Sequence, residues 1–386
     1  PSAVDGAHLL QVLGEDWPTA APQLSLSFGS ASLRLQALQG EPVRNTWIEV
    51  PASAFAAPDQ LAPLALAARR GHQLLRQGAL SALRGEAIAP FNARSLLRPS
   101  AEEALMALQA RAALSGQAPR QPASPILPGQ IYEGIGCRAL ANHCLDEAGA
   151  AGLAGWPEDD VLFGWRGRPL WGARSVMEEC QRGIADDCSL DHLERFVRQD
   201  PVLVYRVLLL VNSAALGNGR EIDTLRHAIM MLGFGAFNAW LGEQLASSET
   251  DEDLHPVRYA QVMRARLAQH LLDGGASESL RSEVYLTALF AQLDRLMQKP
   301  LGPLLHPLPL PGRLLDAVLR QEGPYFSLLE VSAAQSDFEH PHMLPAVCHG
   351  HEISLEHANR SLLRMLATSR DHTHPPRDHP WAMDRD

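Results

Sequence analysis

Residues 200–217 read Asp200-Pro-Val-Leu-Val-Tyr-Arg-Val-Leu-Leu-Leu-Val-Asn-Ser-Ala-Ala-Leu-Gly217. Asp200 is a favourable N-cap residue. Pro201 suits the first position of a helix, because a backbone N–H at that position has no partner within the helix and its absence costs nothing. The residues that follow, as far as Val211, are apolar around almost the whole circumference of a helix. Because a helix without a polar face must be covered on every side, this stretch predicts the central helix of a helical core.

Capped helices are also predicted on both sides of this central helix. Ser189 precedes a run with apolar residues at helical spacing, and Thr224 begins a helix that Gly233 closes. Residues 279–298 carry the clearest helical period of the chain. No strand pattern interrupts these segments. We therefore expect residues 180–370 to form an all-α bundle.

The first 175 residues show a different pattern, in which short strand-like runs alternate with amphipathic helices. Ser100 followed by Glu103 is a capping box that opens one of these helices. Alternation of this kind predicts a mostly parallel sheet, and residues 1–175 are short for a complete eight-stranded barrel of ~250 residues. We therefore expect an α+β chain that begins with a truncated, barrel-like α/β domain. The expected strands are Gln23–Phe28, Thr46–Val50, Ala87–Phe91, Gln130–Ile135 and Gly152–Trp156, and the expected helices include Gln60–Gly78 and Glu102–Leu114.

Composition limits the classes of partner. The 386 residues carry a formal charge of −11 and a single lysine, Lys299. An acidic chain disfavours nucleic acid, which binds clustered basic side chains. Residues 224–245 also fit a DNA-binding helix-turn-helix, but the second helix would offer no Arg or Lys, and a packed helical pair is the favoured interpretation. No segment approaches the roughly 18 apolar residues of a membrane span, so no membrane partner is expected.

Cysteine and histidine usage argues against metals and disulfides. The five cysteines are odd in number and form no C-x-x-C pair, which predicts reduced thiols in the cytoplasm. Several histidines gather between residues 340 and 351 and in residues 371–386, a His- and Pro-rich tail that we expect to be disordered. No framework of cysteines or carboxylates surrounds them, so we expect no metal and no cofactor.

The sequence around the central helix strongly resembles the signature of HDOD domains. The resemblance rests on Asp200, Pro201, Asn212, Ser213, Gly217, Leu232 and Gly233. HDOD domains resemble the HD phosphohydrolase bundle but lack its metal ligands, which implies a regulatory role. The residues agree, because none of the sixteen histidines is followed by aspartate, the pair with which an HD phosphohydrolase holds its metal.

The amino-terminal domain resembles a degenerate EAL-type barrel, the fold of cyclic di-GMP phosphodiesterases. Gln130–Gly136 and Leu153–Pro157 look like the last two strands of that barrel, and Thr46–Val50 looks like a strand that carries a metal-binding glutamate. On this resemblance, Glu49 and Glu133 are the surviving candidates for vestigial metal or nucleotide contacts.

Departures from the EAL pattern imply that catalysis has been lost. Gly136 stands where the resemblance implies a second glutamate, and Ala154 stands where it implies a glutamine. Hydrolysis of this type needs several carboxylates that converge on divalent metals. The triplet Glu103-Ala104-Leu105 spells the family motif, but it lies in a predicted helix, whereas the motif must lie on the first barrel strand.

These observations predict a non-catalytic bacterial signalling protein that acts through protein–protein contacts of its HDOD domain with unidentified signalling proteins. The alternative is a sensor whose EAL-like domain binds cyclic di-GMP without hydrolysing it, and an active phosphodiesterase is the least favoured hypothesis. Buried helices fix both sides of the turn after the central helix, and rigidly supported turns often carry binding residues. We therefore expect Arg220 and Glu221 to border the interaction surface, while the oligomeric state stays open.

Overall fold

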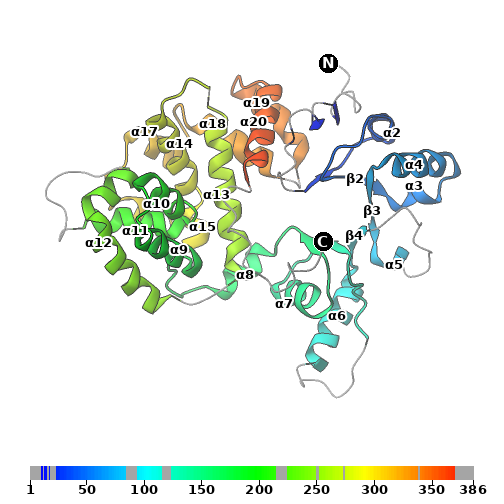
Figure 1. Cartoon of the computed structure of the whole chain (residues 1–386), viewed down its shortest axis with the longest axis horizontal. Coiled ribbons are helices and arrows are strands. Elements are labelled where there is room, and N and C mark those ends of the chain that lie inside the picture. The colour runs from blue at the N-terminus through cyan, green and yellow to red at the C-terminus, as the bar shows by residue number, and fades with distance from the viewer. Residues whose placement is uncertain are drawn as a thin grey trace. The chain divides into compact units, whose positions relative to one another are not determined.

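Two compact units make up the chain, Pro1–Val161 and Leu162–Asp386 (Figure 1). The computed structural model describes residues 10–11, 13–14, 17, 23–83, 94–114, 123–213, 224–248, 252–272, 274–337 and 340–369. Within these residues the first unit is an α/β domain and the second contains helices without strands, as the sequence predicts. None of the described helices is long and apolar enough to cross a bilayer.

A parallel sheet of six strands organises the first unit, and its strands lie side by side in sequence order. This order defines an α/β half-barrel. In β2 the side chains of Thr46, Ile48 and Val50 are buried while their neighbours are half-buried, because successive side chains of a strand point to opposite faces. The strands are β1 Leu24–Leu26, β2 Thr46–Pro51, β3 Gln73–Ala79, β4 Arg94–Arg98, β5 Ile131–Glu133 and β6 Gly152–Ala154.

Helices follow the strands and cover a core around β4 and β5 that includes the buried side chains of Leu97, Tyr132 and Leu140. The predicted capping box is confirmed. Glu103 donates its backbone N–H to Ser100 Oγ at 3.2 Å, and its carboxylate accepts the Ser100 N–H at 2.8 Å. The helices are α2 Ala31–Gln39, α3 Ala52–Ala56, α4 Pro58–Arg70, α5 Leu80–Leu83, α6 Ala101–Leu114, α7 Arg138–Asn142, a π-helical turn His143–Glu147 and α8 Glu158–Gly164.

The expected helix Gln60–Gly78 is wrong over its last part. Helix α4 ends at Gly71, which adopts a left-handed φ of 107° and donates its N–H to the carbonyls of Ala67 and Ala68. A left-handed glycine closes a helix at low steric cost, and the chain then runs directly into β3. Strand pairing therefore overrides the helical pattern after Gly71.

Strand β4 was not predicted, although it pairs with both β3 and β5. Its sequence, Arg94–Arg98, places one arginine at each end of three buried residues, which weakens the apolar pattern that normally reveals a strand. The strand expected at Ala87–Phe91 lies outside the described residues.

Helix α11, Pro201–Val211, lies at the centre of the second unit, as its sequence predicts. Eight of its residues are buried, and Val204, Val207 and Leu208 belong to the main hydrophobic core. Around it are α9 Arg174–Ala185, α10 Leu190–Val197, α12 Leu225–Ser247, α13 Leu254–His270, α14 Glu278–Phe290, α15 Leu293–Met297, α16 Leu301–Leu305, α17 Gly312–Leu315, a π-helical turn Asp316–Arg320, α18 Phe326–Ser336, a 3₁₀ turn Pro341–Met343, α19 Leu344–Gly350 and α20 Leu355–Ala367.

Gly233 interrupts α12 as predicted: its φ of 70° and ψ of 155° are not helical, so α12 is two helical segments that meet at a kink, the second of which continues to Ser247. Glycine allows this kink, since its missing Cβ makes a positive φ accessible. One expected helix of this unit differs from the prediction. The helix expected over residues 279–298 begins after the N-cap Ser277 and is broken between α14 and α15.

Candidate functional site

The two candidate carboxylates of the half-barrel lie on different strands. Glu49 is in the middle of β2 and accepts a hydrogen bond from Ser25 Oγ at 2.8 Å. Glu133 ends β5, and its carboxylate lies 3.5 Å from the Arg98 guanidinium. Each carboxylate therefore has its own partner.

Sheet register keeps these carboxylates apart. Glu49 pairs with Leu75, which pairs with Arg94, whereas Glu133 is level with Arg98 on β4. By register Glu133 therefore lies three strands away from Glu49 and four residues farther along. The two carboxylates also contact different neighbours, Ser25 and Arg98. The described residues contain no group of three His, Cys, Asp or Glu side chains placed to hold a metal.

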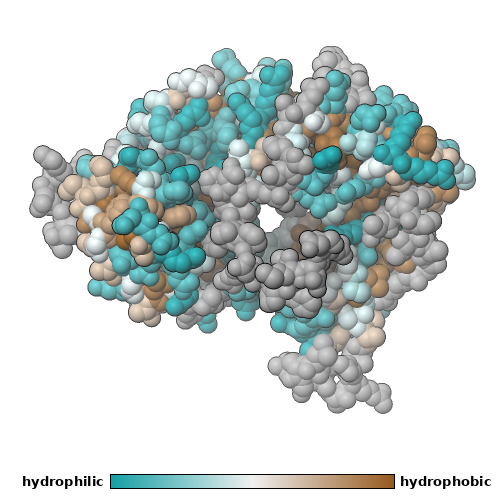
Figure 2. Space-filling view, in the orientation of Figure 1, coloured by the Kyte–Doolittle hydropathy of each residue, from teal (hydrophilic) through white to brown (hydrophobic). Residues whose placement is uncertain are grey.

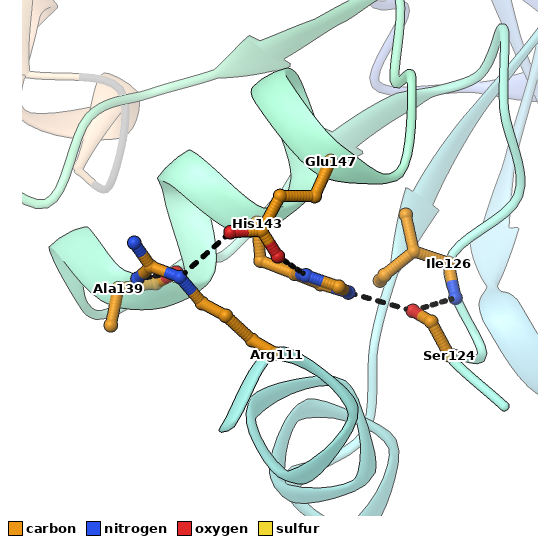
Figure 3. Close-up of polar contacts among 6 residues, drawn as sticks. All are labelled: Arg111, Ser124, Ile126, Ala139, His143 and Glu147. Atoms are coloured by element: carbon orange, nitrogen blue, oxygen red, sulfur yellow. Dashed lines mark hydrogen bonds and ion pairs between the residues drawn. The ribbon is translucent and has the colours of Figure 1, made fainter. Parts of the chain in front are cut away.

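The half-barrel contains a buried polar chain that sequence reasoning did not identify (Figure 3). His143 lies between Ser124 and Glu147, with its Nε2 2.8 Å from Ser124 Oγ and its Nδ1 2.6 Å from the Glu147 carboxylate. Arg111 of α6 also donates to Glu147, at 3.0 Å. Partial burial acts to raise the pKa of Glu147, but the hydrogen bonds from His143 and Arg111 outweigh it and lower that pKa.

A serine, histidine and glutamate in this order also form the chain used in nucleophilic catalysis. Here, however, His143 is 1% exposed. The Ser124 hydroxyl also accepts the backbone N–H of Ile126 at 3.3 Å, as in a turn closed by its own serine (Figure 3). We interpret this hydrogen-bonded series of side chains as structural. It links residues 124–126, which precede β5, to the π-helical turn His143–Glu147. Only His143 and Glu147 are close in sequence, while Ser124 and Arg111 lie 19 and 36 residues from their partners, so no local motif reveals this series.

A second buried polar network surrounds Asp200 in the helical unit. One carboxylate oxygen accepts the Leu203 N–H at 2.7 Å, which caps α11 as predicted. The other accepts the Ala173 N–H at 2.8 Å and forms an ion pair with Arg258 of α13. Asp200 is fully buried, so its charge needs such partners to remain in the interior.

The same network holds the segment that leads into the helical unit. Arg258 donates to the Trp171 carbonyl at 2.8 Å, and Arg206 donates to the Leu170 carbonyl at 2.7 Å. The Arg206 guanidinium lies 3.9 Å from the centroid of the Trp171 ring, a cation–π contact. Burial lowers the pKa of Arg206. The network is therefore a structural clamp that joins residues 170–173, α11 and α13.

The turn after α11 is only partly described. Asn212 donates its side-chain amide to the Leu208 carbonyl at 2.8 Å, so it closes the end of α11. Ser213 follows it in the turn, and its backbone N–H donates to the Leu210 carbonyl at 3.2 Å. The other predicted residues of the turn, Gly217, Arg220 and Glu221, lie outside the described residues.

Thr224, the first described residue after this turn, lines a cleft of about 570 Å³. The other walls come from α14, through Ser279, Glu283 and Leu286, and from the segment Pro309–Leu314. Glu283 and Arg313 form a two-pronged ion pair in the wall, and this pairing raises the pKa of Arg313. The cleft thus combines an ion pair, hydroxyl groups and prolines, and one of its residues, Thr224, follows the predicted interaction turn in the sequence.

Hydrophobic side chains reach the surface on α12, which begins beside the same cleft. Met230 and Met231 are 57% and 49% exposed. Figure 2 shows hydrophobic surface over this part of the helical unit. From Ala228 to Gly242 the helix contains no charged residue. Contiguous apolar surface of this kind is typical of protein contact sites.

The helical bundle with its Asp-Pro helix start defines a known class of domain. Residues 173–299 match the HDOD domain family, and this part of the chain is an HDOD domain.

Two curated relatives support this assignment. The chain is 24% identical over 146 residues to the uncharacterized protein YuxH of Bacillus subtilis, a match that spans 37% of this chain and 36% of YuxH. It is 26% identical over 139 residues to the cyclic di-GMP phosphodiesterase CdgJ of Vibrio cholerae, spanning 36% of this chain and 32% of CdgJ. The matches thus cover about a third of each relative.

A solved structure, the MmoQ response regulator from Methylococcus capsulatus, resembles 51% of this chain with a TM-score of 0.41 and 18% identity, covering 99% of that protein. Likeness at this level supports no inference about function.

The Asp200 clamp predicts where an independently stable helical fragment must begin. A fragment of residues 162–369 keeps Trp171, Ala173 and helix α9, whose Val176 and Met177 are buried. A fragment of residues 180–369, which begins at the boundary expected from the sequence, lacks Trp171, Ala173 and the first half of α9 with its buried Val176 and Met177. We expect its free energy of unfolding in urea to be lower by about 3 kcal/mol or more, from lost apolar burial and unpaired buried groups. Equal stability of the two fragments would show that the clamp contributes nothing.

Proposed function

We propose that this chain is a non-catalytic regulatory protein whose HDOD domain acts by binding signalling proteins. The observation that carries the proposal is the separation of Glu49 from Glu133 by three strand spacings, with each carboxylate engaged by a different neighbour. The half-barrel is proposed to be a degenerate EAL-like domain on the basis of its sequence resemblance. The absence of any His-Asp pair from the sequence supports the same conclusion for the helical unit.

Three neighbouring features support a protein partner. The predicted interaction turn precedes Thr224, Thr224 lines the cleft, and α12 continues from it with exposed methionines. Apolar surface bordered by charged pairs such as Glu283–Arg313 fits the usual composition of protein interfaces, with an apolar centre and a polar rim. We place this function in the cytoplasm, since all five cysteines are free thiols.

A second candidate function is binding of cyclic di-GMP by the half-barrel without hydrolysis. The name of the relative CdgJ favours it, because that protein is a cyclic di-GMP phosphodiesterase. In this candidate Glu49 and Glu133 would contact the nucleotide instead of a metal. Calorimetric titration with cyclic di-GMP tests this candidate. A sensor binds the nucleotide as the full chain and binds it more weakly as the Glu133→Ala variant, whereas a chain without this function shows no binding.

The full chain should not hydrolyse cyclic di-GMP or bis-p-nitrophenyl phosphate with Mg²⁺ or Mn²⁺. The physical reason is that this hydrolysis needs several carboxylates that converge on divalent metals, whereas Glu49 and Glu133 are the two candidates that the sequence retains and each contacts a different neighbour. Product formation is measured by chromatography for the nucleotide and by absorbance for the chromogenic ester. Turnover that disappears in both Glu49→Ala and Glu133→Ala would overturn the non-catalytic proposal.

Substitutions on the proposed docking surface should weaken partner binding without unfolding the protein. Met230→Lys places a charge on an exposed apolar site and should reduce recovery of a native partner about tenfold, as truncation of a central contact does. Arg220→Glu is expected to act in the same direction. The matched control is Leu355→Lys, at a residue that is 40% exposed and begins α20, which contributes no residue to the cleft. Equal recovery by Met230→Lys and Leu355→Lys, with unchanged melting temperatures, would contradict the proposed surface.

A further inference from the structure

The segment that joins α18 to α19 carries two histidines and a methionine within four residues (Figure 1). Residues 340–343 read His340-Pro341-His342-Met343, and all four are exposed. Imidazole nitrogen binds many transition metals, and thioether sulfur binds the soft ones. The segment therefore offers three donor side chains to a metal ion that arrives from solvent.

A 3₁₀ turn, Pro341–Met343, fixes the backbone of this segment. The Met343 N–H donates to the His340 carbonyl at 3.0 Å and closes the turn. Pro341 begins the turn with its φ already restricted by the proline ring. Side chains three residues apart lie on the same side of a 3₁₀ turn, so the backbone places the Met343 thioether on the side of the His340 ring.

A carboxylate orients the ring of His340. Asp337, the C-cap residue of α18, accepts the His340 backbone N–H at 3.1 Å, and its other oxygen lies 3.1 Å from the ring Nδ1. When the proton is on Nδ1, this contact directs the Nε2 lone pair away from the carboxylate. A carboxylate on the far ring nitrogen usually accompanies a metal-binding histidine, because it fixes the tautomer and makes the ligand more basic.

The rings of His340 and His342 are separated by a distance that fits one ion between them. Their centroids are 6.2 Å apart. Two imidazole nitrogens on opposite sides of an ion, each about 2.0 Å from it, place the ring centroids about 6 Å apart. The His342 ring is exposed, so it can turn a nitrogen toward the ion without disturbing the core.

The available donors favour copper(I) over zinc. Structural zinc sites have four ligands, and the described residues contain no group of three His, Cys, Asp or Glu side chains placed to hold an ion. The same lack of a framework underlies the sequence-based expectation of no metal. Copper(I) accepts low coordination numbers and is selected by soft thioether ligands. Two imidazoles and a thioether therefore match its requirements.

The thiols of the chain are weak competitors for copper(I) at neutral pH. Burial raises the pKa of the Cys144 thiol to about 11, and burial likewise raises the pKa of each thiol of Cys180, Cys188 and Cys348. Since the thiolate is the metal ligand, a thiol that stays protonated binds poorly.

We propose that His340, His342 and Met343 form a copper(I) site. Nε2 of His340 and a ring nitrogen of His342 are its principal ligands, and Sδ of Met343 is the third. Asp337 acts as a positioning residue that orients His340. The site lies outside residues 173–299, which match the HDOD family, and depends neither on the proposed docking surface nor on the half-barrel. It gives the helical unit a metal input of its own.

Anaerobic competition with bicinchoninate, a chromophoric copper(I) ligand, measures copper binding by the full chain. We expect His340→Ala/His342→Ala and Met343→Leu each to weaken binding about tenfold or more. Asp337→Ala should also weaken it about tenfold, and Asp337→Asn, which keeps a hydrogen-bond acceptor, should restore part of the loss. The matched control is His306→Ala, at an exposed histidine after α16, which should bind like the unsubstituted chain.

X-ray absorption of the bound copper identifies its ligands. We expect nitrogen neighbours and one sulfur neighbour, and the sulfur should disappear in Met343→Leu. Sulfur that persists in this variant would assign the copper to cysteine and overturn the site.

Three binding results would also contradict the proposal. The first is no copper(I) binding by the unsubstituted chain. The second is equal binding by His340→Ala/His342→Ala and His306→Ala, which would move the ion to the thiols or to the histidines of residues 371–386. The third is zinc binding as tight as copper(I) binding, which would remove the role of the thioether. Melting temperatures that are unchanged in each variant ensure that loss of binding is not loss of folding.

Discussion

A carboxylate in a protein interior is stable only where hydrogen bonds and an opposite charge replace its hydration, and Asp200 has both. It caps α11, receives the Ala173 N–H and pairs with Arg258, whose other donor reaches the Trp171 carbonyl. One buried side chain thereby fixes the central helix, a neighbouring helix and the entry segment. Because removal of either charge would leave the other buried and unpaired, the network is far more costly to break than an exposed ion pair.

The buried charges of the helical unit hold backbone groups in place. Its exposed features include the methionines of α12 and the cleft beside Thr224. In the half-barrel, Glu49 and Glu133 likewise have local partners on neighbouring strands. In both units these polar side chains therefore contribute to the structure of the domain in which they lie.

Local signals predicted much of this structure, and non-local pairing accounts for what they missed. The start of α11 could be predicted because an N-cap aspartate followed directly by proline is a helix signal that two adjacent residues carry. Strand β3 was mistaken for helix because its place is set by pairing with β2 and β4, and only Gly71 marked the change. The partners of Asp200 could not be predicted, since Arg258 and Ala173 reach it from distant parts of the sequence. The same holds for the contact of His143 with Ser124.

The central claim is that the Asp200–Arg258 pair organises the helical unit, and a double-mutant cycle tests it most directly. Asp200→Asn, Arg258→Met and the double variant are compared by urea unfolding of the full chain, with the transition of the helical unit followed by circular dichroism. We predict that each single substitution costs about 3–5 kcal/mol and that the double variant costs at least about 2 kcal/mol less than their sum. Additive effects, or single substitutions that each cost less than about 1 kcal/mol as at an exposed pair, would contradict the account.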